Sequence, residues 1–421
     1  MKLFSTYKIN IITLLKLLII VFICTPLISP RTLSVGSNKQ FNSIKAAIQF
    51  AVNGDTIFVY PGHYKESEIK ISKKLTLLGI NNPVVDGEGK YEIFFINSDN
   101  VKLSGFTISN AGLSFIYDNA GVKLDSAKNC VINKNKFLNN FFAIYLSRSS
   151  DCTIEDNYIA ANSTRETTSG NGIHLWYCKN IKIKNNQISG MRDGIYFEFV
   201  MNADISGNIS KQNLRYGMHF MFSDSCQYWN NTFENNGAGV AVMYSKYVEM
   251  YSNNFQNNWG SASYGILLKD ISDSHIYSNK FMKNTTGIYI EGCNRIIVTK
   301  NYFTGNGWGI KLMSNSMGNE FTLNNFVSNS FDVATNSRQN FNKFDKNYWS
   351  SYKGYDLNRD GIGDVPFHPV KLSSLMVQQQ PASLILLRSL FVEILDTAES
   401  IIPALTPKTL IDEKPMMRQI N

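Results

Sequence analysis

The 421-residue sequence has no cluster of lysine and arginine interleaved with aromatic residues, and charged residues of both signs make up only 18% of it. The formal net charge of +8 is modest, and three of the lysines, Lys2, Lys8 and Lys16, stand close to the N-terminus. Nucleic-acid-binding surfaces carry a basic patch or stripe. The composition therefore argues against a nucleic-acid partner, and low charge with many asparagines and aromatic residues favours a β protein.

Cysteine is also scarce. Apart from Cys24 in the apolar N-terminal stretch, five cysteines remain, and an odd number argues against a disulfide framework. Cys130 and Cys152 stand two residues before the same apolar position of the repeat described next, so we expect them to be neighbours on adjacent coils. They are close enough to touch in that arrangement, but stacked, buried thiols are the favoured interpretation.

The sequence contains ten copies of the pattern apolar-x-x-Asn-x-(aromatic or aliphatic), spaced 22 to 29 residues apart. A fixed period in the twenties is typical of a solenoid, in which each coil buries its apolar face against its neighbours. Asparagine tolerates left-handed turns and its amide bonds backbone groups, so the sequence predicts a structural ladder at one corner. The ladder comprises Asn135, Asn157, Asn186, Asn208, Asn231, Asn253, Asn279, Asn301, Asn324 and Asn347.

A second series, mostly glycine, keeps the same step and opens short runs of alternating apolar and polar residues, which indicate strands. The period is too short for a strand plus a full helix, and the leucine pattern of horseshoe repeats is missing. We therefore predict an all-β fold, a right-handed parallel β-helix with about 22–23 residues per coil. The series is Gly121, Ala143, Gly172, Gly194, Gly217, Gly239, Gly265, Gly287, Gly309 and Asp332.

Four segments follow from these patterns. Lysines followed by the apolar run Ile11 to Ile28 predict a signal peptide over residues 1–30 and a periplasmic protein, with an uncleaved anchor as the alternative. Residues 31–65 form an N-terminal cap, in which a short helix starting near Asn42 or Ser43 covers the open sheet edge. The β-helix spans 66–370, and residues 371–421 form a C-terminal helical tail.

Within that tail we expect a linker at 371–380 and one amphipathic helix at 382–402. Four charged residues in this helix make a membrane span improbable. Just before it, Asp356–Asp364 carries carboxylates and an amide at alternating positions, with glycine at the sixth, as in a calcium loop. Phe367 stands where a bidentate glutamate is expected, so a rigid turn that ends the solenoid is the favoured alternative.

Two coils are lengthened at the same corner, between the asparagine motif and the next glycine-led strand. The insertions are residues 160–170 and 257–263, and they bracket the coils that begin at Gly194, Gly217 and Gly239. Loops added to one edge of a solenoid often build its binding surface. We therefore expect the functional surface between them.

Strand alternation assigns the residues two and four after each glycine to the outer face. His219, Met221 and Met243 then lie on two neighbouring coils of one face, with His174 two coils from His219. Methionine is normally buried, and thioether and imidazole ligands suit Cu(I). The sequence predicts a copper site here; the alternatives are a contact surface for a partner protein, or coincidence. We assign Trp176, Tyr196, Glu198 and Tyr244 as binding residues of the same face.

Catalysis is disfavoured. Asp193, Glu198, Asp270 and Glu291 are not predicted to gather, and the sequence shows no paired carboxylates at general acid–base spacing, no Ser/His/Asp set and no Cys/His zinc pattern. We therefore expect a protein that is not an enzyme. The alternative is a carbohydrate-active or carbohydrate-binding β-helix, because extracellular β-helices often use aspartate clusters on acidic polysaccharides.

Several strings resemble the NosD family of periplasmic maturation proteins for nitrous oxide reductase. The Arg-Tyr-Gly-x-His-x-Met-x-Ser string is specific, the likeness spans roughly residues 40 to 420, and Met218 departs from a position that usually holds a smaller aliphatic residue. The strings are Gly170–Trp176, Arg192–Glu198, Arg215–Ser223, Gly239–Ser245, Gly265–Asp270 and Gly354–Pro366.

The resemblance implies a non-enzymatic partner of an ABC transporter, made of a membrane permease and cytoplasmic ATPases. It implies that copper arrives from a small lipoprotein chaperone and is delivered to the copper–sulfide centre of nitrous oxide reductase. It also implies that the C-terminal helix grips the permease, so that contact with the membrane is made only through partners. No ligand set is carried over, so the copper assignment rests on the residues named above.

Overall fold

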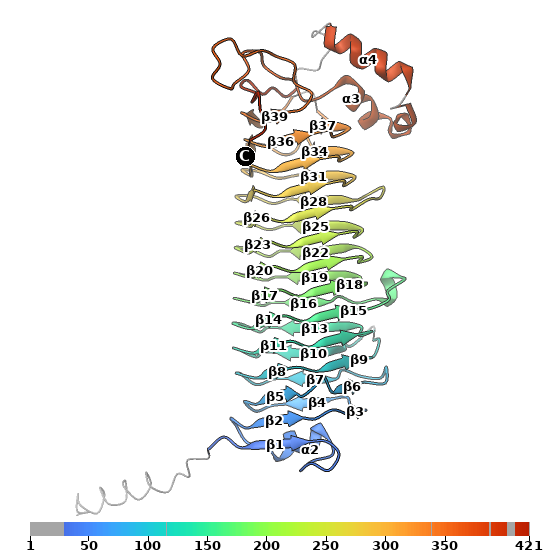
Figure 1. Cartoon of the computed structure of the whole chain (residues 1–421), viewed down its shortest axis with the longest axis vertical. Helices are drawn as coiled ribbons and strands as arrows, with labels where there is room; N and C mark the ends of the chain where they lie inside the picture. The colour runs from blue at the N-terminus through green and yellow to red at the C-terminus, as the bar shows by residue number, and fades with distance from the viewer. Residues whose placement is uncertain (1–28, 115, 338, 387–388, 402–408, 421) are drawn as a thin grey trace, which may run out of the picture.

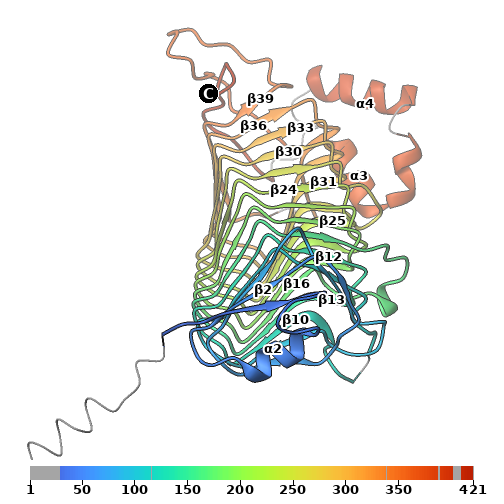
Figure 2. The ribbon, with the colours of Figure 1, turned by 60° about the horizontal axis from the view of Figure 1, so that its bottom comes forward.

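A computed structural model describes residues 29–114, 116–337, 339–386, 389–401 and 409–420. It confirms the predicted parallel β-helix: an elongated column in which each coil contributes one strand to each of three parallel sheets (Figures 1 and 2). The predicted signal peptide, residues 1–30, lies almost wholly outside the described residues. Within the described residues no helix is long and apolar enough to cross a membrane.

Sheet A holds the first strand of each coil. Its 14 parallel strands are, in spatial order, β1 (Thr32–Val35), β2 (Thr56–Val59), β5 (Thr76–Gly79), β8 (Lys102–Ser104), β11 (Val131–Asn133), β14 (Thr153–Glu155), β17 (Lys182–Lys184), β20 (Asp204–Ser206), β23 (Gln227–Trp229), β26 (Glu249–Tyr251), β29 (His275–Tyr277), β32 (Ile297–Thr299), β35 (Glu320–Thr322) and β38 (Lys343–Asp345).

Sheet B follows sheet A after the corner that carries the asparagine ladder. Its 13 strands are β3 (His63–Tyr64), β6 (Val84–Asp86), β9 (Thr107–Ser109), β12 (Lys136–Leu138), β15 (Tyr158–Ala160), β18 (Gln187–Ser189), β21 (Ile209–Lys211), β24 (Thr232–Glu234), β27 (Asn254–Gln256), β30 (Lys280–Met282), β33 (Tyr302–Thr304), β36 (Asn325–Val327) and β39 (Tyr348–Trp349).

Sheet C contains the glycine-led strands and closes each coil. Its 12 strands are β4 (Ile69–Ile71), β7 (Phe94–Ile96), β10 (Ala120–Asp125), β13 (Phe142–Ser147), β16 (Ile173–Trp176), β19 (Asp193–Glu198), β22 (Tyr216–Met221), β25 (Ala238–Met243), β28 (Tyr264–Lys269), β31 (Thr286–Glu291), β34 (Trp308–Leu312) and β37 (Phe331–Thr335).

The glycine series is explained by close stacking of coils. A Cβ added to Gly239 would lie 2.4 Å from the carbonyl oxygen of Gly265 on the next coil, and one added to Gly217 would lie 2.6 Å from the oxygen of Gly239. Real Cβ atoms do not approach an oxygen so closely. Each glycine therefore lets the backbones of neighbouring coils meet at the entry to sheet C.

The asparagine ladder is confirmed. Asn253, which is fully buried, accepts from the backbone N–H and the amide of Asn231, each at 3.0 Å, and donates to the carbonyl of Tyr228 at 2.9 Å and to the side chain of Asn279 at 3.0 Å. This pattern runs from the Phe106 backbone N–H, which donates to Asn135, up to Asn347. It satisfies buried polar groups at a corner where strands cannot pair.

A second asparagine ladder lies at the corner between sheets B and C, which the sequence analysis missed. Its amides bond the next coil in the same way, for example Asn236 N–H to Asn258 at 3.0 Å and Asn284 to Asn306 at 3.1 Å. The predicted inserted loops, 160–170 and 257–263, both emerge at this corner, as expected (Figure 1).

The interior is filled by aromatic and aliphatic columns. Phe255, Phe281, Phe303 and Phe326 stack with centroid separations of 4.7–4.9 Å and near-parallel planes, and Trp349 ends the row 4.3 Å from Phe326. Among the described cysteines, the five predicted to be thiols are buried and free, as expected. The inward residues after each glycine, such as Ile195 and Phe197, are fully buried.

A short helix packs on the N-terminal end of the solenoid. Helix α2 (Ile44–Phe50) begins at Ser43, whose hydroxyl accepts from the Ala46 N–H at 3.2 Å, and its buried face packs on the first coils (Figure 2). Two backbone N–H groups of its first turn, Ile44 and Lys45, donate to the carboxylate of Glu66.

The C-terminal segment differs from the expectation in two ways. The predicted linker at 371–380 is helix α3 (Leu372–Gln379), and the single helix predicted over 382–402 is a 3-10 helix (Pro381–Leu386) followed by helix α4 (Leu390–Ile401). Ser373 and Ser374 are buried, and the Ser374 hydroxyl donates to the carbonyl of Val333 at 3.4 Å. Packing on sheet C therefore outweighs weak helix propensity.

The chain then returns to the solenoid instead of ending in a helical tail. Residues 409–420 lie against the last coil, where the fully buried Asp412 pairs with Phe367 through two backbone hydrogen bonds of 2.9 Å. The Asp412 carboxylate accepts from Asn347 and from the indole of Trp349, each at 3.0 Å. It stands where the next asparagine of the ladder would be.

Candidate functional site

The outer face of sheet C carries the predicted copper residues, and the strand register places them as expected. His174, Tyr196, His219 and Ala241 form one column on β16, β19, β22 and β25. Trp176, Glu198, Met221 and Met243 form the neighbouring column on the same strands. His219 and Met221 thus share one strand and one face, and Met243 stacks on Met221.

The expectation that His219 points freely into solvent is wrong. Its side chain is on the outer face but only 5% exposed, because the rings of Tyr196 and Tyr216 lie against it with centroids at 5.1 and 4.8 Å. Strand alternation assigns a residue to one side of a sheet but does not reveal how its neighbours cover it. Large aromatic side chains on the same and adjacent coils bury the imidazole.

Burial leaves His219 with an unusual bonding state. Among the described groups neither ring nitrogen has a hydrogen-bond partner. Burial, offset slightly by Asp193, lowers the pKa of His219 to about 4, so the ring is neutral near pH 7. A buried polar group without a partner is costly for the folded protein. A neutral imidazole with free lone pairs is also a competent metal ligand.

Burial of His219 predicts an acid-dependent loss of stability. In the unfolded chain His219 takes up a proton near pH 6.5, but in the folded protein it does so only near pH 4. The stability that the neutral ring contributes is therefore complete above pH 6.5 and is lost as the pH falls from 6.5 towards 4. The unfolding free energy of His219→Phe, relative to that of the wild type, should therefore rise by about 2 kcal/mol when the pH is lowered from 7 to 4.5. Urea unfolding at both pH values measures this; Tyr216→Phe, which adds no group that titrates in acid, should shift stability equally at both.

Met221 is two positions after His219 on the same face of β22, Met243 is its register partner on β25, and both thioethers are half-buried. The Tyr196 hydroxyl lies 3.5 Å from the sulfur of Met221, and its ring edge meets His219, so this one tyrosine contacts both residues. The described residues contain no group of three His, Cys, Asp or Glu side chains able to hold a metal ion. Thioether sulfur and imidazole nitrogen are ligands that suit a soft ion such as Cu(I).

His174 does not join this group. Its ring is stacked between Tyr145 and Tyr196 at 4.6 and 4.7 Å, and its Nδ1 lies 3.0 Å from the amide nitrogen of Asn171. Two rungs of roughly 4.8 Å each, with the Tyr196 ring between, separate it from His219. Burial, aided by Arg192, lowers the pKa of His174 to about 3.

The sequence analysis overlooked a buried ion pair beside His219. Asp193 is fully buried, and the guanidinium of Arg215 binds both of its oxygens, at 2.9 and 2.5 Å. The guanidinium also lies 5.1 Å from the ring of Tyr216, which covers His219. The pair thus fixes the tyrosine that shields the imidazole. The sequence did contain a signal for this pair, because Asp193 and Arg215 carry opposite charges and are separated by one period of 22 residues.

A row of aromatic residues, all exposed except the half-buried Phe199, borders the two methionines at the corner between sheets C and A. The residues adopt left-handed backbone conformations (φ 49–55°), where bulky side chains are rare and strained. Neighbouring rings stack at 4.6, 5.2 and 5.0 Å. The row is Tyr177, Phe199, Phe222 and Tyr244, so the predicted binding residue Tyr244 is its last member and is 42% exposed.

The other predicted binding residues lie around the same face. Trp176 packs edge-on against Tyr177 at 4.7 Å, with the guanidinium of Arg148 6.0 Å from its ring. Glu198 stands between Trp176 and Met221 in their column and is half-buried. These residues therefore surround the methionines, and their binding role stays a prediction.

The candidate calcium loop holds its own backbone. The carboxylate of Asp356 accepts from the N–H groups of Asp360 and Gly361, and that of Asp364 accepts from Leu357 at 2.7 Å. Asp360 accepts from Ile362 at 2.8 Å. In these bonds the aspartate oxygens accept from backbone N–H groups of the same loop, as in the rigid turn that was the alternative to a calcium site.

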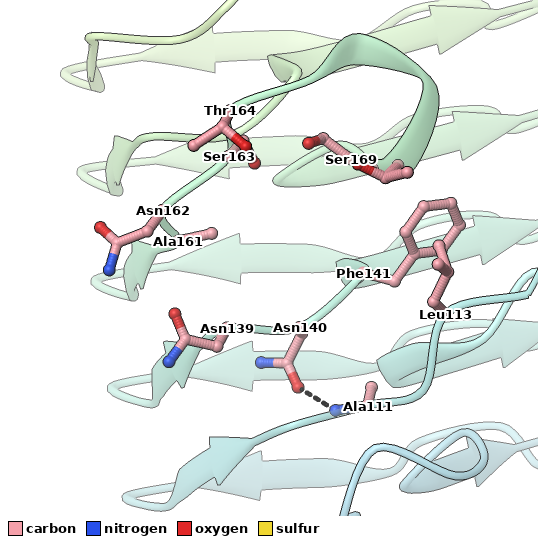
Figure 3. Close-up of a pocket in the computed structure, with 12 residues that line it drawn as sticks. Ala111, Leu113, Asn139, Asn140, Phe141, Ala161, Asn162, Ser163, Thr164 and Ser169 are labelled. Atoms are coloured by element: carbon pink, nitrogen blue, oxygen red, sulfur yellow. Dashed lines mark hydrogen bonds between the residues drawn. The ribbon is translucent and has the colours of Figure 1, made fainter.

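The inserted loop at 160–170 builds a shallow polar cleft of about 270 Å³, away from the methionines. Figure 3 shows the loop from Asn162 to Ser169 arching over Asn139, Asn140 and Phe141, with Leu113 closing one side. The Asn140 side chain is engaged, because its oxygen accepts from the Ala111 N–H at 2.9 Å. The loop therefore forms a surface hollow of its own, and none of the candidate metal residues lines it.

The sequence was compared with known families and proteins. Residues 160–359 match the profile of a family described as "periplasmic copper-binding protein (NosD)", and residues 37–170 match that of the right-handed β-helix region, which agrees with the predicted hand. A probable ABC transporter binding protein NosD of Pseudomonas aeruginosa is 27% identical over 79% of this chain and 82% of its own. A probable ABC transporter binding protein NosD of Stutzerimonas stutzeri is 24% identical over 87% of this chain and 88% of its own.

Solved structures share the fold. A family 28 exopolygalacturonase of Yersinia enterocolitica superposes with a TM-score of 0.61 at 11% identity, covering 75% of this chain and 78% of that one. The Dettilon tailspike protein gives 0.57 at 17% identity, covering 70% and 65%. At these identities the likeness concerns the β-helix alone.

Proposed function

The chain belongs to the NosD family of periplasmic copper-binding proteins, and from this premise we propose that it carries Cu(I) on the outer face of sheet C. In this proposal His219, Met221 and Met243 are the ligands. The protein works in the periplasm beside an ABC transporter permease and its ATPases, takes copper from a lipoprotein chaperone, and supports assembly of the copper–sulfide centre of nitrous oxide reductase.

One observation carries the copper proposal: the buried His219 imidazole, with neither nitrogen bonded, beside two thioethers. Because its pKa is about 4, copper would not compete with a proton at neutral pH. Thioethers and imidazole select a soft ion. A site with only three such ligands, half-covered by tyrosine rings, suits a cargo that is passed on.

The partner contact is supported by the C-terminal segment. Ile385, Leu390 and Ile394 are 87%, 71% and 58% exposed, an unusual concentration of large aliphatic residues outside the solenoid. Exposed apolar patches mark interaction sites. We assign the permease contact to this segment, α4 and the 3-10 helix before it, and the copper exchange to sheet C.

A carbohydrate-active function gains no support from the site. Asp193, the carboxylate near His219, is fully buried, and each of its oxygens accepts a hydrogen bond from Arg215. It is therefore unavailable as an acid or base. The described residues of this face offer Glu198 alone beside the methionines, without a second carboxylate for the two-carboxylate mechanism. We therefore propose a carrier and not an enzyme.

Cu(I) binding by the purified mature protein tests the proposal. Anaerobic competition with bicinchoninate should give about one Cu(I) per chain, His219→Ala should weaken binding at least about tenfold, and the triple alanine variant of His219, Met221 and Met243 should abolish it. The matched control replaces His275, Met201 and Met317, exposed residues of the same kinds, by alanine and should bind normally.

His174→Ala is a second comparison, because Tyr196 separates this residue from the proposed ligands; binding should stay within about threefold of the wild type. An unaltered affinity in the triple variant would remove the site from sheet C while leaving family membership intact.

A further inference from the structure

A larger cleft lies on the same outer face of sheet C, near its C-terminal end, and neither the family nor the proposed copper site accounts for it. Its volume is about 680 Å³, compared with about 270 Å³ for the hollow beneath the 160–170 loop. Volumes of this size are typical of small-molecule sites. The floor belongs to β34 and β37, one wall to the 257–263 loop and the other to α3.

The lining combines aromatic surface with a single cation. Trp259 of the loop and Trp308 and Phe331 of the sheet supply the apolar part, and Lys311 is the charged group. The Lys311 ammonium lies 3.6 Å from the centroid of the Trp308 ring. None of the ion pairs found in the described part of the chain includes Lys311.

Burial alone depresses the pKa of Lys311, to about 8, with no carboxylate opposing the shift. A partly desolvated ammonium without a counter-charge is unfavourable for the folded protein, and the Trp308 face offsets only part of that cost. An anion that enters the cleft would supply the missing charge.

Both walls are fixed, so the cleft is preformed. The Thr285 hydroxyl accepts from the Gly260 N–H at 3.0 Å and donates to the Gly260 carbonyl at 3.1 Å, which pins the loop to the solenoid. Val377 of α3 is 5% exposed and packs with Trp308 and Phe331. Trp259 nevertheless remains 57% exposed at the mouth, although nothing in the fold requires an indole there.

From these observations we propose that the cleft binds a small organic anion with a flat aromatic body, its acidic group on Lys311 and its body against Trp308 and Trp259. The site is distinct from the copper residues: Lys311 lies four rungs from His219 in the same column, roughly 19 Å. Because α3 forms one wall, an occupied cleft also ties the 257–263 loop to the C-terminal helices.

The full-length mature protein and the fluorescent probe 8-anilinonaphthalene-1-sulfonate test this inference. We expect saturable binding of one probe per chain, weakened at least about tenfold in Lys311→Met, which loses a charge-assisted contact. Trp259→Ala, at a half-exposed position that leaves the fold intact, should also weaken binding. Lys269→Met, a charge loss on the same face, is the matched control and should bind like the wild type.

Two further measurements separate this site from nonspecific apolar binding. The neutral analogue 1-anilinonaphthalene should bind the wild type more weakly than the sulfonate does and should not distinguish Lys311→Met from it. Equal binding of the two probes, or an unchanged affinity in Lys311→Met with an unaltered melting temperature, would overturn the proposal. Displacement of the sulfonate probe by sodium sulfate, but not by sodium chloride of equal ionic strength, would overturn it in favour of an inorganic-anion site.

Discussion

Replacing Asn253 by alanine should lower the free energy of unfolding by about 3–5 kcal/mol, because several buried groups lose their partners at once. The substitution removes the acceptor of the Asn231 N–H and amide and the donor to the Tyr228 carbonyl. All of these groups are enclosed at the corner between sheets A and B, where solvent cannot replace the amide. Urea or guanidinium unfolding, followed by circular dichroism, measures the loss.

The adjacent residue provides the matched control. Asn254 is the same residue type, one position later, but its side chain is half-exposed on β27 and forms no hydrogen bond within the described part of the chain. Asn254→Ala should change stability by less than about 0.5 kcal/mol. Comparable losses in the two variants would contradict the ladder as a major source of stability.

Asp412→Ala should detach the C-terminal segment and expose the last coil. The carboxylate accepts hydrogen bonds from Lys346, Asn347, Trp349 and Lys414 at 3.0–3.2 Å, and each donor would be left without a partner. We expect local stability to fall by about 3–5 kcal/mol. Trp349, now 1% exposed, should shift its fluorescence to longer wavelength, and amide exchange across residues 409–420 should accelerate.

Two further variants serve as controls for this result. Asp412→Asn keeps one side-chain oxygen for the ladder and should cost much less than alanine, while Glu413→Ala, at an exposed neighbouring position, should cost almost nothing. If exchange in residues 409–420 stays slow in Asp412→Ala, the segment is held by its backbone pairing with Phe367, and the carboxylate is not the decisive contact.

The repeated part of the fold could be predicted because every coil repeats the same physical requirements. Gly239 is needed where backbones meet, Asn253 where buried corner groups need partners, and Ile195 where the interior must be filled. The second ladder is equally regular in the sequence, as Asn236, Asn258, Asn284 and Asn306 show, but the prediction rested on the motif of the first ladder.

The non-repeated parts escaped prediction for a different reason. Helix α3 depends on contacts of Val377 with Trp308 and Phe331, which are far away in the sequence. The return of Asp412 to the ladder likewise crosses 65 residues from Asn347. Such contacts leave no periodic signal.

For the candidate site, the sequence predicted which residues share a face but not their accessibility. The register of His219, Met221 and Met243 followed from the glycine series, and β22 and β25 confirm it. Burial of His219 depends on the orientation of the Tyr196 and Tyr216 rings. It also depends on Arg215, which is bound by Asp193 and lies against the Tyr216 ring. Those orientations are set by side-chain packing, which the aligned repeat sequences do not reveal.

The row of buried amides has a direction, since every member from Asn135 to Asn347 donates toward the following coil. A carboxylate can receive such bonds but has no hydrogen to pass on, so the relay terminates at Asp412. A strand approaching this end would therefore find no free side-chain amide of the row to bond. One oxygen in place of a nitrogen thus closes the row within the molecule itself.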